Sequence, residues 1–160
     1  MTSPPRDAVL YFDTSALVKR YAAETGSNWV TASCHPSTKN TIATARITKA
    51  EAAAAFASKR RSRGLSQMHY GGVLRDLAHD FVHQYLLVEV DQTLVDLAVD
   101  LTKRQKLRGY DAVQLAAALS LDDMLTQAQF PPLIFVAADN DLLDAARSEG
   151  LTTDNPDRYP

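Results

Sequence analysis

The chain has 160 residues, 46% of them hydrophobic, which is ample for one domain with a sizeable core and short for two. Its formal net charge of -2 excludes a protein that coats nucleic acid through bulk positive charge, so a polyanion must be met by local basic patches. A lone Cys34 cannot form an intrachain disulfide, and neither a signal peptide nor a membrane-spanning run is recognisable. We therefore expect a cytoplasmic protein that does not enter membranes.

A short apolar run predicts the first strand. Val9–Phe12 is typical of a buried strand, and Asp13 follows it directly. Open α/β sheets bind ligands at the carboxyl ends of their strands, so Asp13 can face a cleft. Thr14 and Ser15 offer capping oxygens for a helix over residues 16–22. The alternative is that Asp13 is only a turn or capping residue.

The second predicted strand also leads to an acid. Asn40–Thr44 has the β-branched, alternating character of a strand. Thr48 and Glu51 then fit a capping box at the start of an alanine-rich helix that runs into the basic stretch 59–63. Two interpretations of Glu51 remain open: it faces a site, or its carboxylate only reaches back to the backbone N–H of Thr48.

The middle of the chain predicts two helices around a third strand. Residues 66–85 carry an apolar stripe at helical spacing, and residues 86–90 read as a strand. Asp91 opens the next helix, which ends in the basic stretch 103–108.

Three more acids stand at predicted helix starts. Asp111 opens an almost entirely apolar helix over residues 112–119, which must be buried. Residues 133–137 predict a fourth strand, and Asp139 and Asp141 come directly before the helix that follows it.

Strands and helices of ten or more residues alternate along the chain, which favours parallel pairing with right-handed crossovers. The sheet would have four to five strands, the fifth over residues 150–153. All strand ends then share one edge, where four acids far apart in sequence can converge. These acids are Asp13, Glu51, Asp111 and Asp139. Four independent helix caps would give the same pattern.

Four stretches, in this order, resemble the successive motifs of PIN-domain ribonucleases, and most closely the VapC-like toxins of bacterial toxin–antitoxin pairs. The stretches are 13–21, 47–51, 107–119 and 135–142, with Gly-Tyr-Asp-Ala at 109–112 the most distinctive piece. The match runs from about Val9 to Leu151. It implies a PIN-like three-layer α/β/α sandwich around a mostly parallel sheet. From length and composition we expect one domain over 1–160, with loosely ordered tails at 1–7 and 154–160.

The resemblance also implies a site. In this family Asp13, Glu51, Asp111 and Asp139 would form the acidic pocket that holds Mg²⁺ or Mn²⁺. Ala137 stands where the family often has Ser or Thr, so a hydroxyl next to the fourth acid is missing. Asp141 is a candidate substitute or helper.

The expected chemistry is metal-assisted hydrolysis of RNA. Hard divalent cations prefer oxygen ligands, and a bound cation lowers the pKa of a coordinated water and orients it for in-line attack on phosphorus. Ser15, Lys19 and Arg20, close to Asp13, are candidate ligands of the substrate phosphate. The basic stretches 59–63 and 103–108 hold eight of the seventeen Lys and Arg residues, and either bind the RNA backbone or are solvated helix ends.

Two functions remain in view. The first is a metal-dependent endoribonuclease toxin, expected to be a homodimer and neutralised by a cognate antitoxin whose C-terminal segment covers the acidic groove. The second is a catalytically inactive PIN-like protein-interaction module. A phospho-acceptor signalling domain would need an adjacent acidic pair after the first strand and a lysine after a late strand, and the chain has neither.

Overall fold

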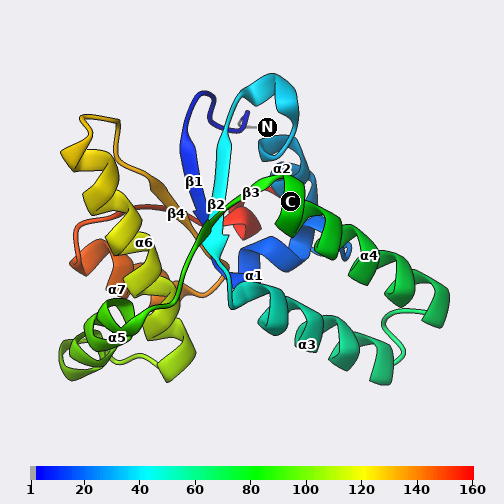
Figure 1. Cartoon of the computed structure of the whole chain (residues 1–160). Coiled ribbons are helices and arrows are strands. Elements are labelled where there is room, and N and C mark those ends of the chain that lie inside the picture. Colours follow the sequence, from blue (N-terminus) through cyan, green and yellow to red (C-terminus); the bar gives the residue numbers. More distant parts are fainter. Residues whose placement is uncertain (1–2) are drawn as a thin grey trace.

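The computed structural model describes residues 3–160, and within them one five-stranded sheet forms the centre of the molecule (Figure 1). Its strands are β1 (Val9–Phe12), β2 (Thr41–Ala45), β3 (Tyr85–Val88), β4 (Ile134–Val136) and β5 (Thr152–Asp154). The order across the sheet is β3-β2-β1-β4-β5, and all neighbouring strands are parallel. This confirms the predicted parallel sheet, with strand bounds within two residues of the predicted ones.

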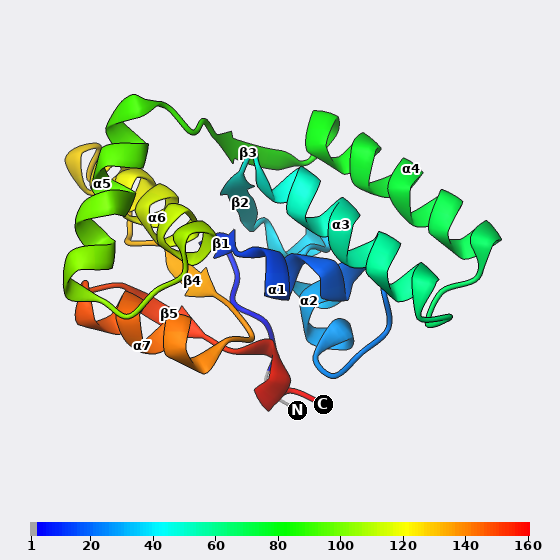
Figure 2. The ribbon, with the colours of Figure 1, turned by 90° about the horizontal axis from the view of Figure 1, so that it is seen from below.

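The helices form a layer on each side of this sheet. Figures 1 and 2 show α1 to α4 over one face and α5 to α7 over the other. The helices are α1 (Thr14–Leu17), α2 (Ser27–Ser33), α3 (Thr48–Arg61), α4 (Gln67–His83), α5 (Gln92–Arg104), α6 (Gly109–Gln127) and α7 (Asn140–Ser148), and the 3-10 turns are η1 (Val18–Arg20), η2 (Pro36–Thr38) and η3 (Pro156–Arg158). The predicted three-layer α/β/α sandwich is therefore confirmed.

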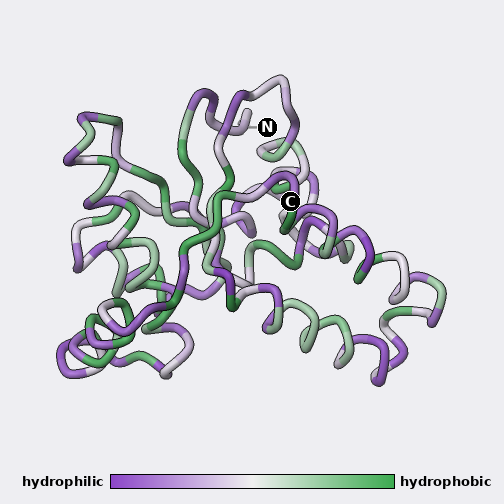
Figure 3. Tube along the Cα trace, viewed as in Figure 1, coloured by the Kyte–Doolittle hydropathy of each residue, from purple (hydrophilic) through white to green (hydrophobic). Residues whose placement is uncertain are grey.

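Each face of the sheet has its own apolar core. Side chains alternate along a strand, so Tyr11 of β1 points into the core under α5 to α7, whereas Leu10 and Phe12 point into the core under α1 to α4. All three side chains are fully buried. A central parallel strand covered on both faces is mostly apolar, and Figure 3 shows hydrophobic colouring over much of β1.

The end of the chain is packed against the body of the protein. The ring of Tyr159 stacks on the ring of Trp29 with centroids 5.0 Å apart. Asp157 Oδ1 forms an ion pair with Lys19 Nζ at 2.8 Å. Asn155 is buried, with its side chain capping η3. The structure thus differs from the expected loosely ordered tail at 154–160, because its aromatic and charged residues have partners that the sequence pattern did not reveal.

The start of the chain is tied down before β1. The Asn40 amide donates to the Pro5 carbonyl oxygen at 2.8 Å, and the backbone N–H of Asp7 donates to the Thr38 carbonyl oxygen at 2.9 Å. The predicted tail at 1–7 thus differs from the structure at residues 5 and 7, while residues 1 and 2 lie outside those described.

Between residues 3 and 160, no helix combines the length and the apolar character that crossing a membrane requires.

Candidate active site

The sheet changes direction between β1 and β4. From β1 the chain builds outward through β2 and β3, and it later returns to the other side of β1 to add β4 and β5. The loops at the carboxyl ends of β1 and β4 therefore leave the sheet in opposite directions, which opens a crevice of the kind where α/β proteins bind ligands. A pocket of about 430 Å³ occupies this place.

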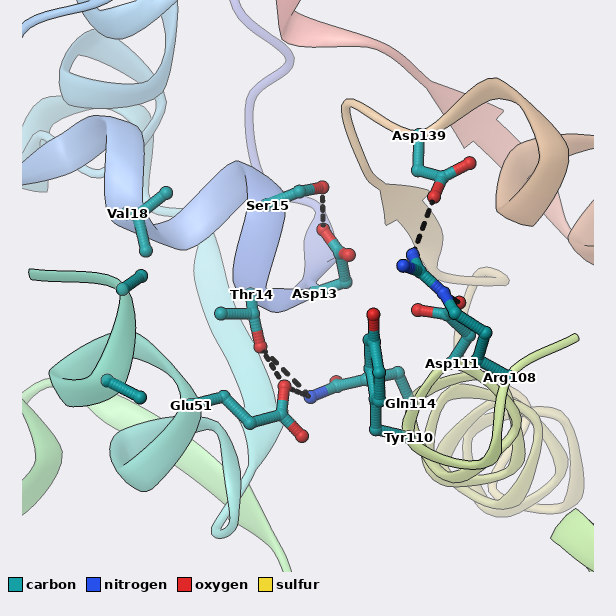
Figure 4. A pocket seen from close by; sticks show the side chains of 12 residues that line it. Asp13, Thr14, Ser15, Val18, Glu51, Arg108, Tyr110, Asp111, Gln114 and Asp139 are labelled. Carbon is teal, nitrogen blue, oxygen red and sulfur yellow. Dashed lines mark hydrogen bonds and ion pairs between the residues drawn. The ribbon is translucent and has the colours of Figure 1, made fainter. Parts of the chain in front are cut away.

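The four predicted acids all line this pocket (Figure 4). Asp13 ends β1, Glu51 lies in the first turn of α3, Asp111 lies in the first turn of α6, and Asp139 precedes α7. The structure thus brings together side chains that are up to 126 positions apart in sequence, from both helical layers. The remaining lining residues are Thr14, Ser15, Val18, Ala54, Ala55, Arg108, Tyr110 and Gln114.

Asp13 is both a cap and a pocket residue. Its Oδ1 accepts from the backbone N–H of Ala16 at 3.0 Å and from the Ser15 hydroxyl at 2.7 Å. The side chain is only 5% exposed. The pKa of Asp13 is raised to about 7, mainly by burial, while the hydrogen bonds from Ser15 and Ala16 lower it and the nearby charge of Asp111 adds a smaller increase. The two interpretations of this residue are therefore compatible.

Glu51 does not form the predicted capping box. Helix α3 begins at Thr48, whose buried hydroxyl accepts from Thr44 and from the Gln114 amide, both within 2.9 Å. The Glu51 carboxylate is turned into the pocket, where Oε2 accepts from the Thr14 hydroxyl and from Gln114 Nε2 at 3.2 Å. Its Oε1 is the one buried side-chain N or O atom among residues 3–160 that has no hydrogen-bond partner. The capping interpretation of Glu51 is wrong.

Gln114 fixes the geometry on this side of the pocket. Its amide donates to Thr48 and Glu51, and its carbonyl oxygen accepts from the Tyr11 hydroxyl at 2.8 Å. The side chain is 1% exposed, so these bonds satisfy a polar group that would be costly to bury alone. Sequence reasoning missed this residue, although a single glutamine inside an otherwise apolar helix was the available signal.

Arg108 joins the two acids on the opposite side. Its Nε donates to Asp111 Oδ2 at 2.9 Å, and one terminal nitrogen lies 3.5 Å from Asp139 Oδ2. Asp139 also caps α7, because its Oδ1 accepts from the backbone N–H of Leu142 at 3.2 Å. The sequence predicts that Arg108 belongs to the basic stretch 103–108 at the end of a helix. The spacing of three residues to Asp111 was the signal that could have revealed the pair.

Ser15 and Asp141 have different positions. The Ser15 hydroxyl lines the pocket but is engaged, since it donates to Asp13 and accepts from the backbone N–H of Ala138 at 2.9 Å. Asp141 does not line the acidic pocket. It borders an adjacent pocket of about 640 Å³ that also contacts Asp111 and Asp139.

Lys19 does not reach the pocket. Its ammonium group is buried and lies 2.8 Å from Asp157 and 3.5 Å from Glu24. The structure therefore gives this cation a partner within the chain, contrary to its predicted role as a phosphate ligand.

Arg20 is likewise held elsewhere. Its guanidinium donates to the Tyr85 hydroxyl at 2.9 Å and to Gln84 Oε1 at 2.8 Å, and it forms an ion pair with Asp80 at 3.3 Å. This network joins η1 to α4 and β3. The predicted phosphate ligands Lys19 and Arg20 thus both lie outside the lining of the acidic pocket.

The donor set of the pocket fits a hard divalent cation. Its acids offer only carboxylate oxygens, which Mg²⁺ and Mn²⁺ prefer, and one buried oxygen, Glu51 Oε1, lacks a donor. Among residues 3–160, however, no three His, Cys, Asp or Glu side chains already have the arrangement of a metal site. The chemistry of these residues fits the ion, and the side chains would have to move closer together to bind it.

Comparison with known proteins agrees with this geometry. No model of a protein family matches the sequence. Two curated relatives from Mycobacterium tuberculosis do match: Ribonuclease VapC45 of strain CDC 1551 / Oshkosh and Ribonuclease VapC49 of strain ATCC 25618 / H37Rv. Each is 32% identical over 145 residues, which covers 89% of this chain and 92% of the relative.

Two solved structures share the fold. The first, VapBC2 from Rickettsia felis bound to a DNA fragment from their promoter, matches with a TM-score of 0.61 and 12% identity, over 92% of this chain and 98% of that one. The second, FitAB bound to an IR36 DNA fragment, matches with a TM-score of 0.59 and 14% identity, over 92% of this chain and 94% of that one. With relatives matched over nearly their whole length and a sheet and pocket of the expected kind, the chain belongs to the VapC-like ribonucleases of the PIN-domain family.

Proposed function

We propose that the protein is a Mg²⁺- or Mn²⁺-dependent endoribonuclease that acts as the toxin of a toxin–antitoxin pair. The relatives named as ribonucleases support the class of reaction. The observation that carries the metal dependence is Glu51 Oε1, a buried carboxylate oxygen without a hydrogen-bond donor in a pocket that three further acids line. Such an oxygen is costly to bury unless a cation binds it.

The residues that would hold the ion are Asp13, Glu51, Asp111 and Asp139. When bound, a divalent ion supplies an activated water and stabilises the charge that develops on the leaving 3′ oxygen. Thr14 and Gln114 hold Glu51 by Oε2 and leave Oε1 facing the pocket.

Asp13 has to be deprotonated to act as a charged ligand. Ser15 and the backbone N–H of Ala16 orient its Oδ1. Since burial raises the pKa of Asp13 to about 7, the carboxyl has to release its proton before it can serve as a charged ligand.

The partner protein would be a cognate antitoxin. The likeness to VapBC2 and FitAB supports such a partner. Beside the acids, the pocket has an apolar wall formed by Val18, Ala54 and Ala55. A C-terminal segment of the antitoxin with apolar and basic side chains could cover both surfaces and block access of RNA.

Calorimetric titration with Mn²⁺, followed by incubation with structured RNAs, tests the proposal. We expect the wild type to bind Mn²⁺ and to cleave RNA only when a divalent ion is present. Asp13→Asn and Asp111→Asn should keep the circular dichroism of the wild type and lose cleavage. Asp96→Asn, an exposed change on α5, is the matched control and should cleave normally.

Unchanged cleavage in the Asp13 or Asp111 variant would refute the site. Absence of both Mn²⁺ binding and cleavage in the wild type would instead favour the inactive interaction module.

A further inference from the structure

The guanidinium of Arg108 lies between two carboxylates that come from different elements (Figure 4). It contacts Oδ2 of Asp111 in α6 and Oδ2 of Asp139 before α7. Its side chain is 65% exposed, whereas that of Asp111 is 12% exposed. Asp111 is therefore the buried partner of the pair, and Arg108 is the exposed partner, which can change its rotamer without displacing packed neighbours.

Arg108 is the one Lys or Arg among residues 3–160 that lines the acidic pocket. Clustered carboxylates repel one another, so a counter-ion stabilises those of them that are charged when no metal is bound. Lys19 and Arg20, the other cations near β1, are paired elsewhere. Arg108 is thus the only side chain in the pocket lining that can neutralise these acids.

The same guanidinium also lies over an aromatic ring. The Arg108 side chain passes over the ring of Tyr110, with its guanidinium carbon 4.7 Å from the ring centroid. Tyr110 is 49% exposed, and it lines the same pocket. A planar guanidinium can rest on an aromatic face after it leaves a carboxylate, and from there it presents its donors to a phosphate.

We propose that Arg108 is an internal counter-ion that a divalent cation displaces from Asp111 and Asp139, and that the released guanidinium then binds the RNA backbone next to the scissile bond. This inference rests on the proposed function. It assigns Arg108 two successive sets of binding partners. In the metal-free protein it holds the two acids, and in the metal-loaded protein it contributes the phosphate contact that Lys19 and Arg20 do not provide.

Competition between Arg108 and a metal ion for the same carboxylates changes the metal affinity in a predictable direction. Any metal that takes Oδ2 of Asp111 or Asp139 must first break an ion pair to Arg108, so the pair weakens apparent metal affinity. Exposed ion pairs are modest, and breaking one changes an equilibrium constant by about fivefold. Removing Arg108 should therefore tighten metal binding, although it removes a residue from the site.

The test is calorimetric titration with Mn²⁺, without RNA and at constant ionic strength. We expect Arg108→Gln to bind Mn²⁺ about fivefold more tightly than the wild type. Arg108→Lys keeps the charge and should bind nearly as the wild type does. Arg104→Gln is the matched control, because Arg104 forms a similar exposed pair with Glu149 at 2.9 Å outside the pocket, and its Mn²⁺ affinity should not change.

A second measurement addresses the released position. At saturating Mn²⁺, Arg108→Gln should raise the KM for a single-stranded RNA about five- to tenfold, while Arg108→Lys should restore most of the loss. Equal or weaker Mn²⁺ binding by Arg108→Gln overturns the counter-ion position, and an unchanged KM overturns the phosphate contact. If the wild type itself binds no Mn²⁺, the proposed function fails as well, so the two failures are distinguishable.

Discussion

Asp13 shows how one carboxylate can serve folding and chemistry together. Its Oδ1 caps α1 through Ala16, and the same side chain lines the acidic pocket. A free cap at a protein surface would keep an ordinary pKa, whereas burial raises the pKa of Asp13 to about 7. The protein therefore holds an acid that changes charge near neutral pH at the place where a cation would bind.

The raised pKa of Asp13 predicts a pH-dependent stability. In the unfolded chain this carboxyl has its ordinary pKa of 3.8, so the folded state binds the proton more tightly. Its stabilising contribution is complete below that value and is lost as the pH rises through about 7. Without metal, the free energy of unfolding should fall over this range by on the order of 2–4 kcal/mol from this group.

Urea denaturation between pH 4 and 8 would measure this effect. Asp13→Asn should remove most of the fall, and Asp96→Asn should leave it in place. The affinity for Mn²⁺ should move in the opposite direction and increase as the pH rises through about 7, because binding requires the charged carboxylate. An identical pH profile in the wild type and the Asp13 variant would contradict the prediction.

Glu51→Gln tests whether this carboxylate is a metal ligand. The amide keeps the shape of the side chain and can still accept from Thr14 and Gln114, but it is a much poorer metal ligand because it is neutral. We expect a folded protein, as stable as the wild type or more so without metal, since repulsion in the pocket is relieved. Cleavage of RNA should be nearly abolished.

Thr48→Ala is the contrasting change. The Thr48 hydroxyl joins Thr44 to Gln114 in a buried network, so its removal should cost about 1–2 kcal/mol in urea denaturation. Full activity together with lower stability in Glu51→Gln would contradict the metal-ligand role of Glu51 and indicate a structural role instead.

Among the elements, α6 depends most on a polar contact for its placement. Gln114 joins this helix to β1 through Tyr11 and to α3 through Thr48 and Glu51. Apart from Asp111, the rest of the buried face of α6 is apolar, and apolar contacts are not directional. The directional bonds of Gln114 fix the helix at the register that brings Asp111 to the pocket.

Gln114→Ala should destabilise the protein by about 2–4 kcal/mol in urea denaturation, because it leaves the buried Tyr11 hydroxyl without its acceptor and removes one donor each from Thr48 and Glu51. Binding of Mn²⁺ should weaken as well, since Glu51 loses one of its two donors. Gln127→Ala, in the exposed last turn of the same helix, is the control and should change stability by less than about 0.5 kcal/mol. Equal stability of the two variants would contradict the role of Gln114.

Strand positions and the acids that follow them were predictable from the sequence because both depend on local pattern. An apolar run such as Val9–Phe12 followed by an acid needs no tertiary information. Partners chosen at long range were not predictable. Lys19 is close to Asp13 in sequence yet pairs with Asp157 near the other end of the chain. The capping box of Glu51 fitted locally, but the pocket supplied Thr14 and Gln114 as better partners.

At the scale of the whole molecule, the topology explains why the site needs both helical layers. Asp13 and Glu51 lie with the layer of α1 to α4, and Asp111 and Asp139 begin helices of the layer α5 to α7 (Figure 2). The pocket therefore spans the edge of the sheet between the layers. A relative movement of the layers would change the distance between the two pairs of acids and hence the affinity for a cation.

The predicted homodimer also concerns the whole molecule. Exposed apolar side chains near one edge of the sheet suggest a surface on which it would form. Most of the apolar stripe on α4 faces inward, including the buried Leu77 and Phe81. Val82, at the end of α4, remains 71% exposed, and Leu86 on β3 is 44% exposed. Strand β3 is an edge of the sheet, and an exposed edge beside apolar side chains favours association.

We therefore expect light scattering at micromolar concentration to give twice the mass of one chain, and we expect Val82→Glu to give the mass of a monomer. A charge introduced at this position would have to be buried without a partner in the dimer, and that costs several kcal/mol in association, enough to shift the equilibrium a hundredfold or more. Met68→Glu is the matched control, because Met68 is 89% exposed near the opposite end of the same helix and a dimer at the β3 edge does not bury it. A monomeric wild type would refute the dimer, and dissociation by Met68→Glu alone would move the interface to the other end of α4.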